Sequence, residues 1–179
     1  MKNLLFSALA VCLAVLQVNA QTRYLDEVFD EVTVTTDVVY GQNITVITAL
    51  QGLPPMMEDL KCDIYEPTGD TETERPLLLI FHTGNFLPPY VNGGALGTKS
   101  DNWEVEMATR YAKMGYVVAS CDYRLGWNPL AATQEERTLQ LIQAAYRGVQ
   151  DSRTAVRFFR KSNAEDGNPY GVDPDKIGM

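Results

Sequence analysis

Residues 77–86 read LLLIFHTGNF, and this stretch decides the fold class. Its first half, Leu77 to Phe81, is a continuous apolar run without a polar face, which is typical of a strand buried on both sides of a parallel sheet. A loop rich in Gly, Pro and Asn follows, from Thr83 to Asp101. The stretch therefore predicts an α/β fold, in which ligands bind at the carboxyl ends of the strands.

The residues after this loop alternate between helix and strand. Trp103 to Met114 predicts a helix, Tyr116 to Ser120 a second buried strand, and Gln134 to Asn163 a long helix. Lys176 to Met179 predicts the start of a third central strand. This order predicts a mostly parallel sheet with right-handed crossovers and helices on its faces.

Both predicted helices carry an apolar stripe that should face the sheet. We expect Asp101 to be the N-cap of the first helix and Gly115 its C-cap. In the second helix, Gly148 is a point where the helix could be interrupted. The stripe of the first helix consists of Trp103, Met107, Tyr111 and Met114, and that of the second of Leu139, Ile142, Ala145, Val149, Ala155, Val156, Phe158 and Phe159.

The residues before the central stretch predict strands at an edge of the sheet. Val28 to Tyr40 alternates apolar and polar residues, Gly41 interrupts the pattern, and Asn43 to Leu50 resumes it. Leu60 to Tyr65 alternates as well and predicts a further strand.

The first twenty residues have the pattern of a cleaved secretory signal peptide. Lys2 precedes an apolar run that is short for a transmembrane helix, and the run ends at Ala20. We therefore expect one mature domain, residues 21–179, secreted or periplasmic, without a transmembrane anchor. The chain has a formal net charge of −8, which argues against a nucleic-acid partner.

Residues 82–86, His-Thr-Gly-Asn-Phe, could carry chemistry because they follow the buried strand directly. Glycine and small residues let a backbone turn tightly enough to direct successive N–H groups into one space, where they can stabilise an oxyanion. His82 could brace this turn or transfer protons. Bracing is favoured, because a general base also needs a nucleophile within reach. A single histidine and no close Cys/His spacing make a metal site a poor expectation.

Five sequence blocks, taken in order, resemble the first half of an α/β-hydrolase of the carboxylesterase/lipase type. The resemblance extends over residues 25–179, roughly the whole mature chain. The blocks are residues 63–67 (DIYEP), 77–86 (LLLIFHTGNF), 122–126 (DYRLG), 149–158 (VQDSRTAVRF) and 170–177 (YGVDPDKI).

The resemblance implies roles for several residues. Gly84 and Asn85 would offer the amides of an oxyanion hole, and His82 would brace the loop. Thr83 and Asn85 stand where the family's loop has glycines, so the turn must accommodate two side chains.

Two further pairs of residues follow from the resemblance. In family-like packing, Arg124 would form a structural ion pair with Asp151; the alternative is a solvated arginine on a loop. Cys62 and Cys121 would lie on neighbouring strands, where a disulfide could form. Two separate buried thiols are favoured over a disulfide, because disulfide geometry is strict.

The catalytic triad of that family is not found in residues 1–179. The Gly-x-Ser-x-Gly elbow would begin near Gly178, and none of the five serines, at positions 7, 100, 120, 152 and 162, lies in such a motif. We therefore expect an N-terminal fragment of a secreted serine hydrolase acting on small carboxylic esters, inactive by itself and needing no cofactor. Its last strand should be a long apolar edge. The alternative is a non-catalytic secreted or surface binding module on the same fold. The oligomeric state is left open.

Overall fold

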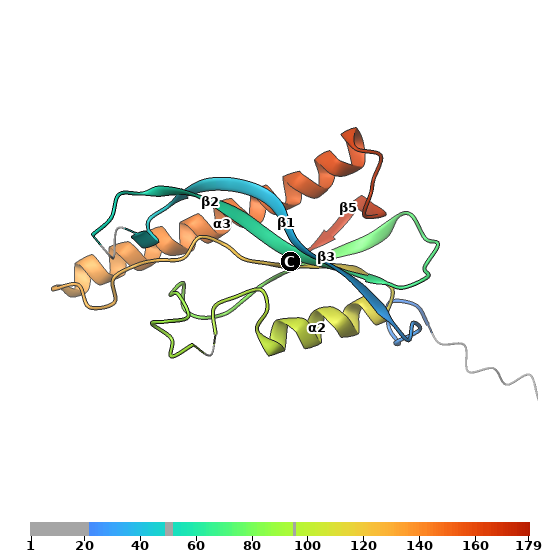
Figure 1. Ribbon diagram of the computed structural model, residues 1–179, viewed down its shortest axis with the longest axis horizontal. Helices are drawn as coiled ribbons and strands as arrows, with labels where there is room; N and C mark the ends of the chain where they lie inside the picture. The colour runs from blue at the N-terminus through green and yellow to red at the C-terminus, as the bar shows by residue number, and fades with distance from the viewer. Residues whose placement is uncertain (1–21, 49–51, 95) are drawn as a thin grey trace, which may run out of the picture.

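The computed structural model describes residues 22–48, 52–94 and 96–179, and the expected signal peptide lies outside them. In these residues a five-stranded mixed sheet has one long helix on each face (Figure 1). Along the chain the elements are β1 (Val32–Thr45), β2 (Met56–Pro67), β3 (Arg75–Phe81), α2 (Asn102–Lys113), β4 (Val117–Cys121), α3 (Gln134–Glu165) and β5 (Val172–Gly178). No described helix is both long and apolar enough to cross a membrane.

The strands lie in the order β1-β2-β4-β3-β5. β1 pairs antiparallel with β2, and β2 pairs antiparallel with β4. β4, β3 and β5 are mutually parallel. The expected parallel centre is therefore present, with two antiparallel strands on one side. Because β3 and β4 run in the same direction, the loops that follow them emerge at the same edge of the sheet.

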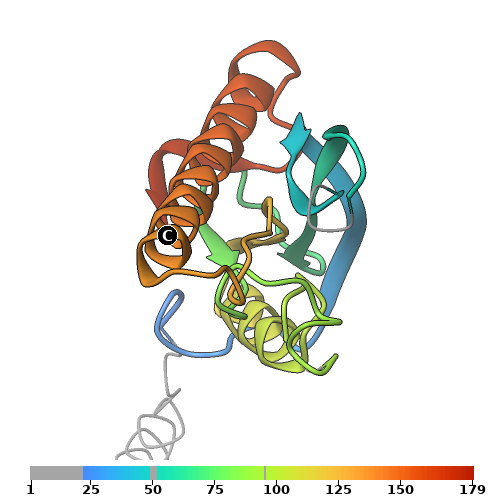
Figure 2. The same cartoon turned by 90° about the vertical axis from the view of Figure 1, so that its left-hand side faces the viewer.

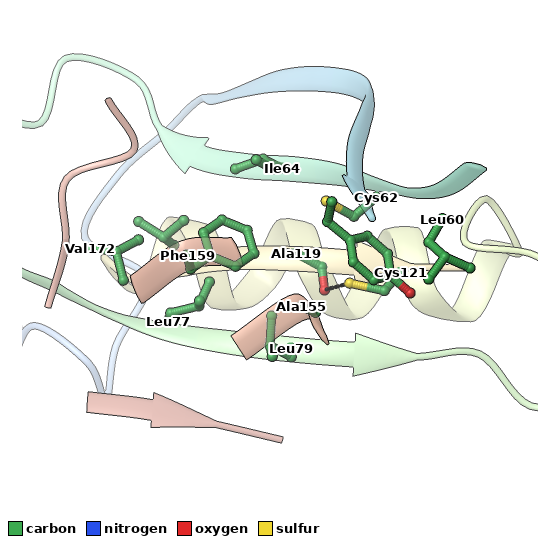
Figure 3. Close-up of a cluster of buried hydrophobic side chains, with 12 residues drawn as sticks. Leu60, Cys62, Ile64, Leu77, Leu79, Ala119, Cys121, Ala155, Phe159 and Val172 are labelled. Atoms are coloured by element: carbon green, nitrogen blue, oxygen red, sulfur yellow. Dashed lines mark hydrogen bonds between the residues drawn. The ribbon is translucent and has the colours of Figure 1, made fainter. Parts of the chain in front are cut away.

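The core consists of two layers, one on each face of the sheet. The larger layer lies under α3 and includes Leu60, Ile64, Leu77 and Phe159 (Figure 3). The smaller layer lies under α2 and includes Ala108, Ala112 and Val118. Figure 2 shows α3 running along its face of the sheet, with α2 on the opposite side. β4 is buried along its whole length and is the true central strand.

β3 is less enclosed than its apolar sequence predicts. Leu77 and Leu79 are buried, whereas Leu78 and Ile80 on the other face are only half-buried. The reason is that α2 covers β4 and β2 more than it covers β3. The position of a helix over the sheet cannot be derived from the pattern of one strand. The expectation that this run is buried on both sides was wrong for one of its faces.

β1 is one continuous strand, so the expected interruption at Gly41 is wrong. The strand passes through Gly41 with a register shift between Val39 and Gly41. A Cβ atom at Gly41 would lie 2.7 Å from Thr154 Cγ2 of α3. Glycine is needed here because the helix approaches the strand closely, and not because the strand ends.

The two helices form where the sequence predicts them, but their buried faces differ from the expected stripes. In α2 the buried residues are Glu104, Ala108 and Ala112, whereas Trp103 is 61% exposed. Asp101 is the N-cap residue, yet its side chain makes no capping hydrogen bond. Both faces of α2 have residues at helical spacing, so the periodicity predicted the wrong face as the buried one.

The stripe of α3 is correct only in its second half. Ala155 and Phe159 are buried, whereas Leu139, Ile142 and Val149 are more than half exposed. Gly148 does not interrupt the helix, which begins with a capping box formed by Thr133 and Glu136. The buried half packs on the sheet, and the exposed half extends beyond it.

β5 is the edge strand next to β3, and it is not the long apolar edge that the sequence was expected to give. Its seven residues include Pro174, and the side chains of Asp175 and Lys176 are exposed. Lys176 Nζ lies 2.8 Å from Asp173 Oδ2. Proline and charges are features that protect natural edge strands from further pairing.

Candidate active site

Two loops meet at the carboxyl ends of β3 and β4. The first we call the glycine loop, residues 82–87. The second we call the bracing segment, residues 122–127. Each follows its strand directly. Their positions agree with the rule that α/β sheets bind ligands at this edge.

Every backbone carbonyl of the glycine loop accepts a hydrogen bond. The bracing segment supplies three of the donors, the side chain of Asn92 supplies two, and the ring of His82 supplies one. The bonds are Tyr123 Oη to His82 O (2.9 Å), His82 Nδ1 to Thr83 O (2.7 Å), Asn92 Nδ2 to Gly84 O (2.8 Å) and to Leu87 O (3.0 Å), Trp127 Nε1 to Asn85 O (2.8 Å) and Gly126 N to Phe86 O (2.8 Å).

In contrast to these carbonyls, most backbone amides of the glycine loop make no hydrogen bond to a described residue. Within the described part of the chain, the N–H groups of residues 83–86 have no hydrogen-bond acceptor. Three consecutive residues have positive φ, namely Gly84 (113°), Asn85 (56°) and Phe86 (59°). Left-handed backbone is costly for side chains such as those of Asn85 and Phe86. A strained turn with fixed carbonyls and free amides is what an anion-binding backbone site requires.

His82 lies at the base of the glycine loop. Its Nδ1 contacts a carbonyl, which only accepts, so Nδ1 carries the proton in this arrangement. The ring stacks on Tyr123, with centroids 4.5 Å apart, and its buried Nε2 lies 3.7 Å from Asp122 Oδ1. Only Nδ1 makes a hydrogen bond, within the loop itself, and Nε2 has no hydrogen-bond partner among the described residues.

Tyr123, in the bracing segment, contacts the glycine loop through both its hydroxyl and its ring. Burial raises the pKa of Tyr123 to about 12, so its hydroxyl stays protonated and donates to His82 O. Its ring also makes an edge contact with Phe86 at 5.8 Å between centroids.

Asp122 lies beside the two ends of the long β3–α2 connection. Its Oδ1 accepts from the backbone N of Lys99 at 2.7 Å and lies near His82 Nε2. Burial raises the pKa of the Asp122 carboxyl, although the Lys99 amide and His82 act against this rise. The last part of the connection is therefore hydrogen-bonded to this carboxylate, and His82 of the first part lies beside it without a hydrogen bond.

The side chain of Lys99 anchors the same connection to the sheet. Lys99 Nζ lies 2.7 Å from Asp63 Oδ1 and 3.3 Å from Asp37 Oδ1, and Ser120 Oγ donates to Lys99 O. Burial opposes the charged form of Lys99, but the bonds to Asp63 and Asp37 outweigh it and raise its pKa. This buried lysine was not singled out from the sequence, because its partners lie far away in the chain.

The structure places Arg124 and Asp151 in direct contact. Arg124 Nη2 lies 2.7 Å from Asp151 Oδ1, Arg124 Nε lies 2.9 Å from Asp151 Oδ2, and the Arg124 backbone N also donates to Asp151 Oδ2. Arg124 is 4% exposed and Asp151 is fully buried. The pair fastens the bracing segment to α3, and it does not face the glycine loop's amides.

A pocket of about 420 Å³ opens beside the glycine loop. Its wall combines aromatic side chains of the loops with small residues of α3, including Ala145 and Gly148. Ser152 and His82 both line it, but Ser152 Oγ donates to Val149 O at 3.0 Å and His82 Nδ1 is bonded to Thr83 O. The two side chains do not form a nucleophile–base pair.

Cys62 and Cys121 are both free thiols, completely buried, and neither lines this pocket. Among the described residues, no cluster of His, Cys, Asp or Glu has the arrangement of a metal site. Residues that the sequence analysis missed are Asn92, Tyr123 and Trp127. Their polar side-chain atoms point at glycine-loop carbonyls. Only the position of the aromatic residues soon after β4 could have indicated this role in the sequence.

No family model and no curated protein matches the chain. Among solved structures it is similar to the thermophilic esterase Est2 of Thermogutta terrifontis, with 25% identity and a TM-score of 0.43 over 67% of this chain and 34% of that one. It is similar to the carboxylesterase EST55 of Geobacillus stearothermophilus, with 24% identity and a TM-score of 0.49 over 88% and 36%. It is also similar to the hyperthermophilic esterase of Pyrobaculum calidifontis, with 20% identity and a TM-score of 0.40 over 83% of this chain and 33% of that one.

The neighbouring positions of β2 and β4, expected from the family resemblance, are present beside a parallel centre flanked by helices. The strand order and the helices on both faces agree with the incomplete α/β-hydrolase-type sheet that the sequence predicts. The chain spans about a third of the length of each esterase named above. None of these TM-scores is high enough to carry a functional argument, so the function is inferred from this chain's own geometry.

Proposed function

We propose that this chain supplies the oxyanion hole of a secreted serine hydrolase that acts on small carboxylic esters. One observation carries the proposal: in the glycine loop every carbonyl is held by a donor, while the amides of residues 83–86 are free. Acyl transfer develops a negative charge on the former carbonyl oxygen, and fixed amides stabilise that charge without reorganising. Gly84 and Asn85 are the amides we assign to this role.

The nucleophile, acid and base of such an enzyme would come from outside residues 1–179. Ser152 and His82 are committed to other contacts, and they are not a substitute. This proposal gives the glycine loop and the adjacent pocket the task of holding the ester, with the aromatic wall contacting its apolar part. No residue here is assigned to a cofactor.

The test uses the protein encoded by the complete gene, assayed with p-nitrophenyl butyrate. A Cβ atom at Gly84 would lie 3.1 Å from the backbone of Gly97, at a φ that side chains rarely adopt. Gly84→Ala must therefore displace the loop, and we expect kcat to fall roughly 100-fold or more, with a small change in KM.

Gly93→Ala is the matched control. Gly93 also has positive φ and lies in the same connection, but an added Cβ would meet nothing within 4 Å. Equal loss of kcat in both variants would overturn the role of the glycine loop. If the complete protein hydrolyses no ester and no serine reacts with a fluorophosphonate probe, the alternative of a non-catalytic binding module replaces the proposal.

A further inference from the structure

We propose that Cys62 and Cys121 form a disulfide that fastens β2 to β4. This inference is independent of the proposed hydrolase function. The two residues are direct partners in the antiparallel ladder between these strands. A covalent bond at this point would join the two halves of the sheet, because β2 and β4 are where the antiparallel part meets the parallel part.

The register places the cysteines at the position where cross-strand side chains approach most closely. Asp122 N donates to Lys61 O at 2.9 Å, so Lys61 and Asp122 are a hydrogen-bonded pair. Hydrogen-bonded and non-hydrogen-bonded pairs alternate, which makes Cys62 and Cys121 a non-hydrogen-bonded pair. Such pairs have Cα atoms about 4.5 Å apart, within the range that disulfides span.

Both thiols also point to the same face of the sheet. Each belongs to the core layer under α3, with Leu60 and Ile64 alternating around Cys62 and Ala119 preceding Cys121 (Figure 3). In the reduced form Cys121 Sγ contacts Ala119 O at 3.5 Å. Burial, together with contact with the Cys62 thiol, raises the pKa of Cys121, so this thiol is not suited to act as a nucleophile in the folded protein.

The bond must therefore form while the chain folds, before the core closes. A thiolate of one cysteine attacks an oxidant disulfide, such as oxidised glutathione, and releases one reduced thiol. The second cysteine then attacks this mixed disulfide and releases the other. Two protein thiols are oxidised by two electrons and one oxidant disulfide is reduced to two thiols, so the exchange balances.

The closed loop contains the glycine loop and α2. Asp122 and Tyr123, which hold the glycine loop, follow Cys121 directly in the chain. A disulfide at Cys121 would restrict how far this end of β4 can separate from β2. After folding, the bond would be shielded, because both cysteines are 0% exposed.

The experiment is refolding of the chain carrying Cys12→Ser, which leaves only the pair, in a glutathione redox buffer. We expect no alkylation by iodoacetamide under denaturing conditions, a mass lower by two hydrogens, and a linked peptide containing both cysteines. Dithiothreitol should then lower Tm by about 10 °C, from the closure of a loop of this length.

Cys62→Ala and Cys121→Ala are the matched controls, and each should abolish the effect of dithiothreitol on Tm. The proposal is overturned if both cysteines are alkylated after oxidative refolding. It is equally overturned if oxidation yields only disulfide-linked dimers, or if oxidised and reduced proteins unfold at the same temperature.

Discussion

At the scale of single residues, two buried ion pairs act as structural constraints. Arg124 with Asp151, and Lys99 with Asp63, connect segments that are distant in the chain. Removing one partner leaves the other buried and unpaired, which costs more than the intact pair contributes. Each pair therefore acts mainly as a constraint on which segments lie together.

Arg124→Met should destabilise the protein by about 3–5 kcal/mol, because it leaves the Asp151 carboxylate buried without its partner. The free energy of unfolding in urea measures this change. The double variant Arg124→Met/Asp151→Leu should recover most of the loss. Lys161→Met is the control, because Lys161 and Glu165 form an exposed pair and the expected change is below about 0.5 kcal/mol. An equal effect of both single variants would contradict the argument.

Asp70 should make the protein sensitive to acid. Burial acts to raise the pKa of this carboxyl, but the hydrogen bonds from Arg23 outweigh burial and lower it. A group with a lowered folded-state pKa stabilises the protein above its unfolded pKa of about 3.9. That contribution is lost as pH falls through the lower folded value. Tm measured from neutral pH down to about pH 2 should drop less steeply for Asp70→Asn than for the unaltered protein.

At the scale of elements, the packing depends on close contacts between segments that are distant in the sequence, and local sequence patterns do not reveal such contacts. Gly41 lets α3 approach β1, and Asp122 accepts a hydrogen bond from Lys99 N at one end of the β3–α2 connection and lies beside His82 at the other. In the sequence, Gly41 looked like the end of a strand, because glycine more often marks a break than a crossing helix. The identity of the neighbouring helix residue, Thr154, was needed to decide between the two.

Gly41→Ala should destabilise the protein by about 1–3 kcal/mol, because the new methyl group would overlap with Thr154 Cγ2. Thr154→Ala removes that atom, so Gly41→Ala/Thr154→Ala should be more stable than the sum of the single changes predicts. Urea unfolding of the four proteins gives the coupling energy. Strict additivity would mean that the glycine serves the strand and not the helix contact.

Asp122→Ala should loosen the glycine loop, because the backbone N of Lys99 loses its acceptor and the ring of His82 loses the carboxylate packed beside it. Trp127 reports the change, since its Nε1 donates to Asn85 O. In a Trp103→Phe background, acrylamide quenching of Trp127 should rise about two-fold in the alanine variant. Asp122→Asn keeps an acceptor for Lys99 N and should change the quenching little. Equal quenching in both variants would show that the carboxylate does not hold the loop.

At the scale of the whole molecule, the sequence predicted the alternation of strands and helices and the edge at which the site lies. The run Leu77 to Phe81 and the segments from Trp103 to Met179 predicted the alternation, and His82 to Phe86 indicated the edge of the candidate site. The burial faces of α2 and α3 were not predictable, since they depend on where each helix lies over the sheet. The donors that hold the glycine loop were missed for the same reason, as Asn92 and Trp127 meet the loop only through tertiary structure.

The charged edge strand β5 leads to a prediction about association. Among the described residues no strand pairs with β5 on the side away from β3, and apolar residues in place of the exposed Asp175 and Lys176 would offer an uninterrupted surface for strand pairing. Asp175→Val/Lys176→Val leaves the net charge unchanged and should cause concentration-dependent association, seen by light scattering coupled to size exclusion.

Lys161→Val/Glu165→Val is the matched control, because it also removes one charge of each sign, from the exposed side of α3, where the backbone has no unpaired strand edge. This variant should stay at the size of the unaltered protein. If the two double variants associate equally, added surface hydrophobicity is the cause and the edge has no special role. If only the β5 variant associates, the charges on that strand are what limit its pairing.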